Sequence, residues 1–380
     1  MTKIYLIRHA EAEGNLYRRI QGHYDGDITE TGKRQIEALS HRFKNIQIDA
    51  LYASDLQRTQ KTAGAILKHH SELSLNIDPR LKEIGLGIWE DQPWGNASFD
   101  YPEQMLLFGT NPEKWHIEGG ESFADLKSRI TEVINELAEK HKGQTIACVS
   151  HGMAIRALIS TILGVSSENI SQISHGDNTC VALLNIEKGK TSIEYYNDTA
   201  HLDENLSTFA KQGWHKNSVK PDITSLRFYP MELSADAQLY KDCYKEGWQA
   251  AHGTTRGYSE APYIKAATKV SSKDPLTLMK ALYGDEFAGI LELDPERMAE
   301  EGAGWISFVY IAPEFRGRGL ACQLIGQAVS YYRKKGRSSL CLHVSEINSR
   351  ALALYESLGF HCIGTEEGNV SILQLLQKSI

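Results

Sequence analysis

The chain lacks the features that would place a protein in a membrane, outside the cell or on nucleic acid. Its 380 residues contain no apolar run close to the roughly 20 residues of a membrane-spanning helix, and the N-terminus has no apolar core long enough for a signal peptide. The six cysteines are scattered and form no CxxC pair, which favours buried, reduced thiols over disulfides or a metal site. A formal net charge of -7 argues against general nucleic-acid binding. We therefore expect a cytoplasmic protein with no membrane or nucleic-acid partner.

The length and the patterning predict two domains. A chain of 380 residues is longer than one hydrophobic core usually supports. In the first half, short apolar runs alternate with longer amphipathic stretches, which is typical of an α/β domain with a mostly parallel sheet. We predict a first domain over residues 1–200, a linker over 201–222 with a short helix over 203–212, and a second domain over 223–380, where a new alternation starts.

The expected elements follow from these periodicities. In the first domain we expect strands over 3–7, 49–53, 145–150 and 179–186, and helices over 30–44, 55–70, 121–141 and 153–163. In the second domain we expect strands over 224–230, 278–283, 286–293, 304–312 and 339–344, and helices over 235–250, 319–335 and 348–358.

Basic and imidazole side chains follow three of the expected strands of the first domain. Arg8 and His9 follow the first strand, Arg58 lies just beyond the second, and His151 follows the strand over 145–150. Ligands of parallel sheets bind beyond the carboxyl ends of the strands. We therefore expect these four side chains to share one pocket.

The surroundings of Arg58 favour an anion. Ser54 and Gln57 have the spacing of a capping box, which predicts a helix start at residue 55 and places Arg58 in the first turn. Free N–H groups and the helix dipole attract anions there, and a guanidinium binds phosphate through two hydrogen bonds. A single arginine or histidine is more often a structural or solvated residue, but the combination at three strand ends indicates a phosphate site.

Four short motifs follow one another along the first 200 residues. They are Arg8-His9 with Asn15, Ser54 to Thr59, Leu81 to Glu90, and Ser150-His151-Gly152. Together they resemble the signature motifs of the histidine phosphatase (phosphoglycerate mutase-like) superfamily. The resemblance implies a three-layer α/β/α domain that needs no metal.

The same resemblance implies a role for each matching residue. His9 attacks phosphorus and becomes phosphohistidine, so its other ring nitrogen should be held as a donor. Glu83 protonates the leaving oxygen and later takes a proton from water, which requires a partly buried carboxyl; Glu90 is the alternative carrier. The residues implied to bind the phosphate oxygens are Arg8, Asn15, Gln21, Gly22, Arg58 and His151.

The motifs depart from the family pattern at two positions. Ala10 and Ala12 stand where a glycine and a threonine are common, which affects the expected substrate more than the expected mechanism. The stretch between Glu83 and His151 is shorter than the insert of true mutases, so hydrolysis is favoured over a phosphoglycerate mutase-type transfer. Residues 92–118 are expected to form a cap over the leaving group, although their aromatic side chains are also compatible with simple packing. These are Trp94, Phe99, Tyr101, Phe108 and Trp115.

The second domain carries a glycine-rich turn between a strand and a helix. Gly317 and Gly319 allow backbone N–H groups to converge on a pyrophosphate at a helix N-terminus. The turn is neither GxGxxG nor a P-loop. Arg316 to Ala321 and Asn348 to Phe360 resemble motifs A and B of the GNAT acetyltransferases, over roughly residues 223–380. The resemblance implies an α+β acyltransferase domain with acetyl-CoA as co-substrate.

By this resemblance, backbone groups of the turn hold the pyrophosphate, and a strand edge pairs with the pantetheine arm, which Asn348 helps to position. Tyr355 is the expected acid for the leaving thiolate, with core packing as its alternative role. Glu292 and His343 are both weak candidates for the base. The residues expected at the acetyl-CoA site are Val309, Tyr310, Ile311, Arg316, Gly317, Arg318, Gly319, Leu320, Ala321 and Asn348.

The sequence thus predicts a bifunctional enzyme that acts on a small phosphate ester and on an amine of a small molecule or a protein. Residues 251–275 are expected to border the amine site. One hypothesis from the fusion is that both domains act in turn on one phosphorylated amine. The alternative is that one domain is a non-catalytic sensor that binds CoA or a phosphorylated metabolite and regulates the other domain. The lack of an obvious base favours this role for the second domain over the first. The oligomeric state stays open.

Overall fold

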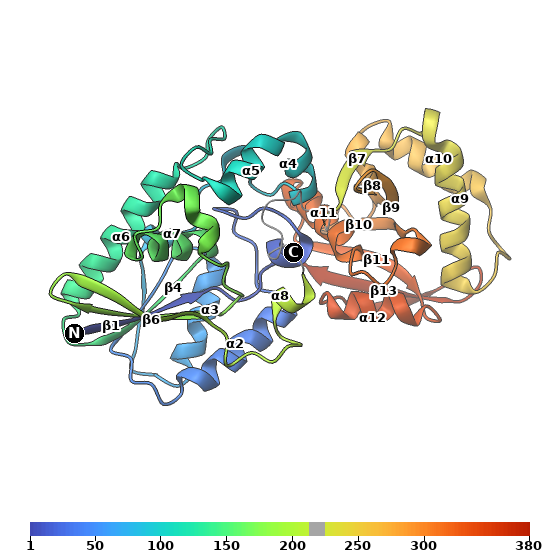
Figure 1. The fold of residues 1–380 in the computed structure, drawn as a ribbon. Helices are drawn as coiled ribbons and strands as arrows, with labels where there is room; N and C mark the ends of the chain where they lie inside the picture. The colour runs from blue at the N-terminus through green and yellow to red at the C-terminus, as the bar shows by residue number, and fades with distance from the viewer. Residues whose placement is uncertain (213–224) are drawn as a thin grey trace. The chain divides into compact units, whose positions relative to one another are not determined.

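The computed structural model describes residues 1–212 and 225–380 of the chain (Figure 1). The described residues divide into two compact units. The first consists of residues 1–92 and 97–224, and the second of residues 93–96 and 225–380. Residues 213–222 of the expected linker and Thr224 lie outside the described residues. Each unit is considered by itself below.

The sheet of the first unit has the strand order β3-β2-β4-β1-β5-β6. Its strands are β1 (Thr2–Arg8), β2 (Ala50–Ala53), β3 (Leu75–Ile77), β4 (Thr145–Ser150), β5 (Val181–Glu187) and β6 (Lys190–Asp198). The first four are mutually parallel, whereas β5 pairs antiparallel with β1 and β6 pairs antiparallel with β5. Apolar residues such as Ile7, Leu51 and Val149 are fully buried, as expected for a sheet covered on both faces.

Helices cover both faces of this sheet, so the unit has three layers, as the sequence predicts. In Figure 1, α6 and α7 lie on one face, and α2 and α3 on the other. The helices of the unit are α1 (Glu13–Tyr17), α2 (Glu30–Phe43), α3 (Gln57–Leu67), α5 (Pro102–Thr110), α6 (Phe123–Lys140), α7 (Gly152–Ile162) and α8 (Thr208–Lys211). Helix α4 (Trp94–Asp100) spans the division, because residues 94–96 are assigned to the second unit and residues 97–100 to the first.

The register of the sheet brings the three functional strand ends together. Arg8 is opposite Ser150, and Ala53 is opposite Val149, so β1, β2 and β4 end at the same edge. The capping box expected at Ser54 is wrong. Helix α3 begins only at Gln57, without a side-chain cap, because the Ser54 hydroxyl bonds His151 instead.

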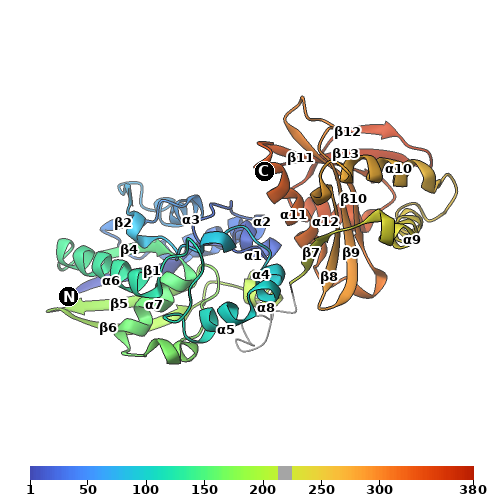
Figure 2. The same cartoon turned by 90° about the horizontal axis from the view of Figure 1, so that it is seen from above.

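The second unit is built on a sheet with the order β12-β13-β11-β10-β9-β8-β7. Its strands are β7 (Arg227–Pro230), β8 (Leu278–Tyr283), β9 (Glu286–Asp294), β10 (Ala303–Ile311), β11 (Ser339–Ser345), β12 (His361–Glu367) and β13 (Ile372–Ser379). Figure 2 shows these strands side by side. Only the pair β10–β11 is parallel, which agrees with the expected α+β class.

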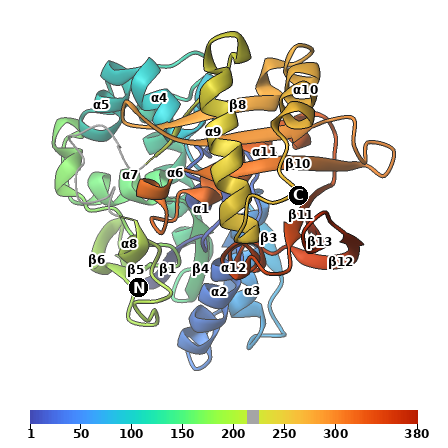
Figure 3. The ribbon, with the colours of Figure 1, turned by 90° about the vertical axis from the view of Figure 1, so that its right-hand side faces the viewer.

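The helices of this unit are α9 (Leu233–His252), α10 (Glu260–Ser271), α11 (Ala321–Lys334) and α12 (Ser349–Ser357). Helices α9 and α10 pack against each other and against β8 to β11, and Figure 3 shows them in front of these strands. Tyr332 of α11 contacts Gly304, where an added Cβ would lie 2.3 Å from its ring, so α11 packs closely on β10. Short 3-10 helices lie at Pro79–Leu81, Gly87–Trp89, Ser167–Gln172, Pro275–Thr277 and Pro313–Phe315.

Two findings bear on the composition-based expectations. Among the described residues, no helix is long and apolar enough to cross a membrane. Four of the six cysteines are buried as expected, but Cys322 is only partly buried and Cys362 is exposed.

Candidate active sites

His9 lies at the end of β1 and is buried, with 3% of its surface exposed. Its Nδ1 lies 2.7 Å from the Ala10 carbonyl oxygen, which can only accept, so Nδ1 carries the proton. Burial lowers the pKa of His9 well below its usual value, and the nearby Arg58 and Arg8 guanidinium groups add to this effect. The ring is therefore neutral, and Nε2 keeps the lone pair that a nucleophile needs.

His151 faces His9, with ring centroids 5.2 Å apart. Its Nε2 lies 2.8 Å from the Ser54 hydroxyl, and burial lowers its pKa well below the usual value, with Arg58 as the next cause. Within residues 1–212, the buried Nδ1 of His151 has no hydrogen-bond partner. This nitrogen is therefore available to a ligand.

The two arginines are held by backbone carbonyl groups rather than by carboxylates. Arg8 donates from Nη1 to Gly176 O at 2.5 Å, and Arg58 donates from Nη1 to Tyr24 O and from Nη2 to Gly22 O, at 2.8 and 2.7 Å. The buried Nε atoms of both arginines have no partner in the described part of the unit. Their positive charges thus remain available to an anion.

Glu83 is fixed by the start of α7. Its carboxylate accepts N–H bonds from Ile84, Met153 and Ala154 at 2.9–3.1 Å. A Cβ placed on Gly152 would lie 3.4 Å from Arg8 Nε and 3.7 Å from Glu83 Oε2, so these two groups border the same point.

Glu90, the alternative carrier, has a different environment. Its two oxygens accept the N–H groups of Gly22, His23, Tyr24 and Leu86. Glu90 therefore shapes the loop that holds Arg58, whereas Glu83 borders Arg8.

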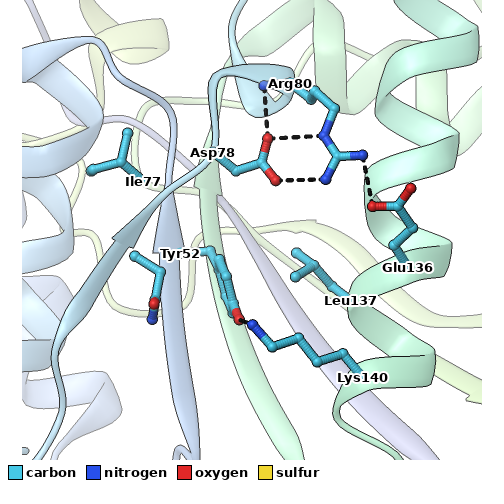
Figure 4. A pocket seen from close by; sticks show the side chains of 8 residues that line it. Tyr52, Ile77, Asp78, Arg80, Glu136, Leu137 and Lys140 are labelled. Carbon is cyan, nitrogen blue, oxygen red and sulfur yellow. Dashed lines mark hydrogen bonds and ion pairs between the residues drawn. The ribbon is translucent and has the colours of Figure 1, made fainter.

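Arg129 of α6 clasps the loop that carries Glu83. It donates to the carbonyl oxygens of Arg80, Lys82 and Glu83, and pairs with Glu121 at 2.6 Å. The next stretch of α6 borders a cavity of about 370 Å³, shown in Figure 4. Its charged groups largely satisfy one another, since Arg80 bonds both Asp78 and Glu136. This cavity contains none of the expected catalytic residues.

The other three expected phosphate ligands already form hydrogen bonds within the protein. Asn15 accepts the Ala12 N–H through Oδ1. Gln21 accepts the Gly14 N–H, while its buried Nε2 has no partner among the described residues. Gly22 gives its N–H to Glu90, so it contributes to the pocket by holding Arg58 through its carbonyl oxygen.

The structure adds residues that the motifs do not indicate. Asn178 donates from Nδ2 to the His9 carbonyl oxygen at 2.9 Å. Phe209 of α8 lies against Arg8, with the guanidinium carbon 5.9 Å from the ring centroid, and Gln212 donates to Asn15 O at 2.9 Å. They follow the last motif by 26 positions or more, so only the tertiary fold reveals them.

The expected aromatic cap divides into packed and exposed rings. Phe108 and Trp115 contact each other and the buried Trp89, with centroids 5.1–6.1 Å apart. Phe99 is 57% exposed. Packing therefore accounts for Phe108 and Trp115.

In the second unit, the glycine-rich turn has an open, exposed geometry. Gly317 and Gly319 have φ values of 77° and 73°, and an added Cβ would meet nothing within 4 Å. The Arg316 side chain is engaged elsewhere, because it donates to Ile311 O and pairs with Glu246. Backbone N–H groups before α11 thus suit a pyrophosphate, as the motif implies.

Strands β10 and β11 stop pairing partway along β10. Their pairing runs from Ala303–Ser339 to Ile306–Leu342, while β10 continues to Ile311. Within the described sheet, the edge over 307–311 that turns away from β9 has no strand partner. This edge includes Val309, Tyr310 and Ile311, the segment expected to pair with pantetheine.

The remaining motif B residues lie on or beside α12. Asn348 caps the helix, because its Oδ1 accepts the Ala351 N–H at 3.2 Å. Tyr355 is 8% exposed and packs edge-on against Phe360, and burial raises its pKa. His343 lies beside Trp305 and 3.5 Å from Glu366.

The fold and these two sites match known families. Residues 4–199 match the histidine phosphatase superfamily (branch 1), so the chain belongs to that superfamily, and residues 237–360 match the acetyltransferase (GNAT) family. The protein is an enzyme that combines a phosphatase or phosphoglycerate mutase-like domain with a GNAT domain. In the described residues, no group of three or more His, Cys, Asp or Glu side chains is placed to hold a metal ion.

Individual relatives align with the first unit. Phosphoserine phosphatase 1 of Hydrogenobacter thermophilus is 32% identical over 204 residues, which is 54% of this chain and 96% of the relative. The probable phosphoglycerate mutase GpmB of Yersinia pestis is 32% identical over 213 residues, 53% of this chain and 96% of the relative. The solved structure of Bacillus stearothermophilus YhfR is 26% identical with a TM-score of 0.52, covering 53% of this chain and all of that one.

Proposed function

We propose that the first unit hydrolyses phosphate monoesters through a phosphohistidine at His9. The observation that carries this proposal is the hydrogen bond from Nδ1 to Ala10 O, which leaves Nε2 unprotonated between two guanidinium groups. Nε2 forms a bond to phosphorus while the ester P–O bond breaks, and the leaving oxygen takes a proton from Glu83. Arg8, Arg58 and His151 stabilise the charge on the phosphoryl oxygens.

In the second step, water attacks the phosphohistidine. Glu83 takes the proton of this water, the N–P bond breaks, and inorganic phosphate leaves. The relative named as a phosphoserine phosphatase supports hydrolysis, while the probable mutase makes transfer to a second hydroxyl the competing reaction.

Trapping the covalent intermediate tests this proposal. We expect acid-labile phosphate on the wild-type chain during turnover of p-nitrophenyl phosphate, and none on His9→Ala, with activity lowered at least 1000-fold. His41→Ala, which changes an exposed histidine of α2 outside the expected cap, should behave like the wild type. Hydrolysis that persists in His9→Ala contradicts the nucleophile assignment.

We infer further that the second unit transfers acetyl from acetyl-CoA to an amine. The parting of β10 from β11 and the open turn at Gly317 and Gly319 support this activity. Backbone groups of the turn would hold the pyrophosphate, the free edge of β10 would pair with pantetheine, and Tyr355 would protonate the thiolate. Calorimetric titration should give micromolar binding of acetyl-CoA. A titration without heat of binding contradicts this inference.

A further inference from the structure

A buried carboxylate lies in the middle of the second sheet. Glu292 of β9 is 6% exposed, and no lysine or arginine among the described residues pairs with it. The Tyr240 hydroxyl of α9 donates to it at 2.8 Å. Burial raises the pKa of Glu292 to about 7, so the group can take up a proton near neutral pH.

A β-bulge places this carboxylate beside the point where β10 and β11 part. Ile306 and Phe308 pair with the adjacent residues Leu293 and Glu292, so Ser307 is an extra residue in β10. Because neighbouring residues of β9 point to opposite faces, Phe308 lies on the face of Glu292, toward α9. The parallel pairing of β10 with β11 ends at the same bulge, after Ile306.

Five aromatic side chains, here called the aromatic wall, contact one another in series from Phe308, the residue of β10 that pairs with Glu292. Tyr244 stacks between Phe308 and Tyr263, with both centroids 4.2 Å away. Tyr258 lies parallel to Tyr263 at 6.1 Å, and Trp248 contacts both at 6.0 Å. All five rings are only partly buried, and Trp248 Nε1 has no hydrogen-bond partner among the described residues.

We propose that this surface is the acceptor site of the second unit, that it takes a primary amine on a flat aromatic stem, and that Glu292 removes the proton of the ammonium group. The proposal rests on the acetyl transfer proposed above. Phe308 and Tyr263 cover the two faces of Tyr244, so the stem stacks on the other, partly exposed rings of the aromatic wall. Glu292 lies next to the strand edge assigned to pantetheine, because it pairs with Phe308 of β10.

The proton steps balance without another reactant. Glu292 takes one proton from the ammonium group and later releases it to water. The neutral amine attacks the thioester carbonyl carbon, a C–N bond forms, and the C–S bond breaks. The nitrogen then loses its second proton to water, the leaving thiolate takes the hydroxyl proton of Tyr355, and Tyr355 regains a proton from water. The products are the amide and CoA.

The first experiment tests Glu292 with 2-phenylethylamine as the acceptor. Glu292→Gln cannot accept a proton, so we expect kcat to fall about 100-fold or more, while the calorimetric Kd for acetyl-CoA stays within about twofold. In the wild type, kcat/KM should fall as the pH drops below about 7, and Glu292→Gln should lack this decline. Glu286→Gln, at an exposed position of the same strand, is the matched control. Wild-type kcat in Glu292→Gln overturns the assignment.

A second variant separates catalysis from packing. The Tyr240 hydroxyl stabilises the carboxylate, so Tyr240→Phe should move the acidic decline to higher pH; a purely structural role would leave its midpoint unchanged. The other titratable groups that interact with Glu292 are Tyr244 of α9 and Asp294 on its own strand. None of these is altered by the substitution.

The second experiment tests the acceptor class. We compare 2-phenylethylamine with 2-cyclohexylethylamine, which has a similar size but no π-face. The aromatic amine should have a KM about 2- to 12-fold lower, and Tyr263→Leu should abolish this preference. Equal KM values for the two amines contradict the aromatic stem. Binding of acetyl-CoA without acetylation of either amine overturns the acceptor site alone, whereas failure to bind acetyl-CoA overturns the acetyl transfer on which it rests.

Discussion

At the scale of single residues, the first site depends on two histidines kept neutral in a buried, cationic pocket. Burial and the nearby guanidinium groups lower the pKa of both His9 and His151. The cations proposed to bind the phosphate therefore act together with burial to keep the proposed nucleophile unprotonated. The same arrangement lowers the stability of the folded unit at low pH.

We expect the first unit to lose stability as the pH falls below about 6.5. The unfolded chain protonates His9 and His151 near that pH, whereas the folded chain does not, so unfolding takes up protons. Each histidine should lower the free energy of unfolding by about 1.4 kcal/mol per pH unit, down to its pKa in the folded state. Urea unfolding at pH 7.5 and 5.5 measures this slope.

A variant of His9 tests whether the pH dependence of the unfolding free energy comes from this histidine. His9→Asn should reduce the pH dependence by the share of one histidine. Equal slopes in His9→Asn and wild type would show that His9 is protonated in the folded protein.

The motif residues could be predicted from the sequence because each follows a strand of a parallel sheet. Arg8, His9, Arg58 and His151 meet in one pocket for that reason. Asn178 and Phe209 could not be predicted, since they reach the pocket through later parts of the chain.

At the scale of elements, regular periodicity predicts strands and helices well but not their irregularities. The expected strand over 304–312 appears as β10, but alternation alone would place Ile306 and Phe308 on one face. The bulge at Ser307 separates them and brings Phe308 to Glu292. Likewise, the Ser54 side chain bonds His151 instead of capping α3. In both cases tertiary contacts override a local pattern.

The helix α11 provides a matched pair of glycines for testing the pyrophosphate site. Gly319 precedes the helix and Gly336 follows it; their φ values are 73° and 72°, and neither has a neighbour within 4 Å. An alanine at either position costs roughly 1–2 kcal/mol, because a Cβ disfavours this conformation. We expect Gly319→Ala to weaken acetyl-CoA binding about tenfold or more, and Gly336→Ala to leave it unchanged.

Calorimetric titration of both variants distinguishes binding from stability, since both carry a similar strain. Equal Kd values for acetyl-CoA in the two variants would contradict the assignment of the turn at Gly319 to the acetyl-CoA site.

At the scale of the whole molecule, the residues of each site come from one unit. All the contacts described for His9 and Arg58 come from residues 1–92 and 97–224, and those of Glu292 come from residues 225–380. Among the described residues, the printed partners of each proposed catalytic group thus belong to its own unit. This arrangement favours two activities that operate separately over a sensor domain that regulates its neighbour.

We therefore expect saturating acetyl-CoA to change the hydrolysis of p-nitrophenyl phosphate by less than about twofold, and His9→Ala to keep the wild-type Kd for acetyl-CoA. Acetyl-CoA carries phosphate groups of its own and can compete at the first site. Gly319→Ala separates the two effects: inhibition that persists in this variant comes from direct competition, whereas an effect that disappears with Gly319→Ala comes from the second unit. If acetyl-CoA changes hydrolysis strongly in the wild type but not in Gly319→Ala, and no amine is acetylated, the second unit is a CoA sensor. That result would contradict the separate operation of the two sites.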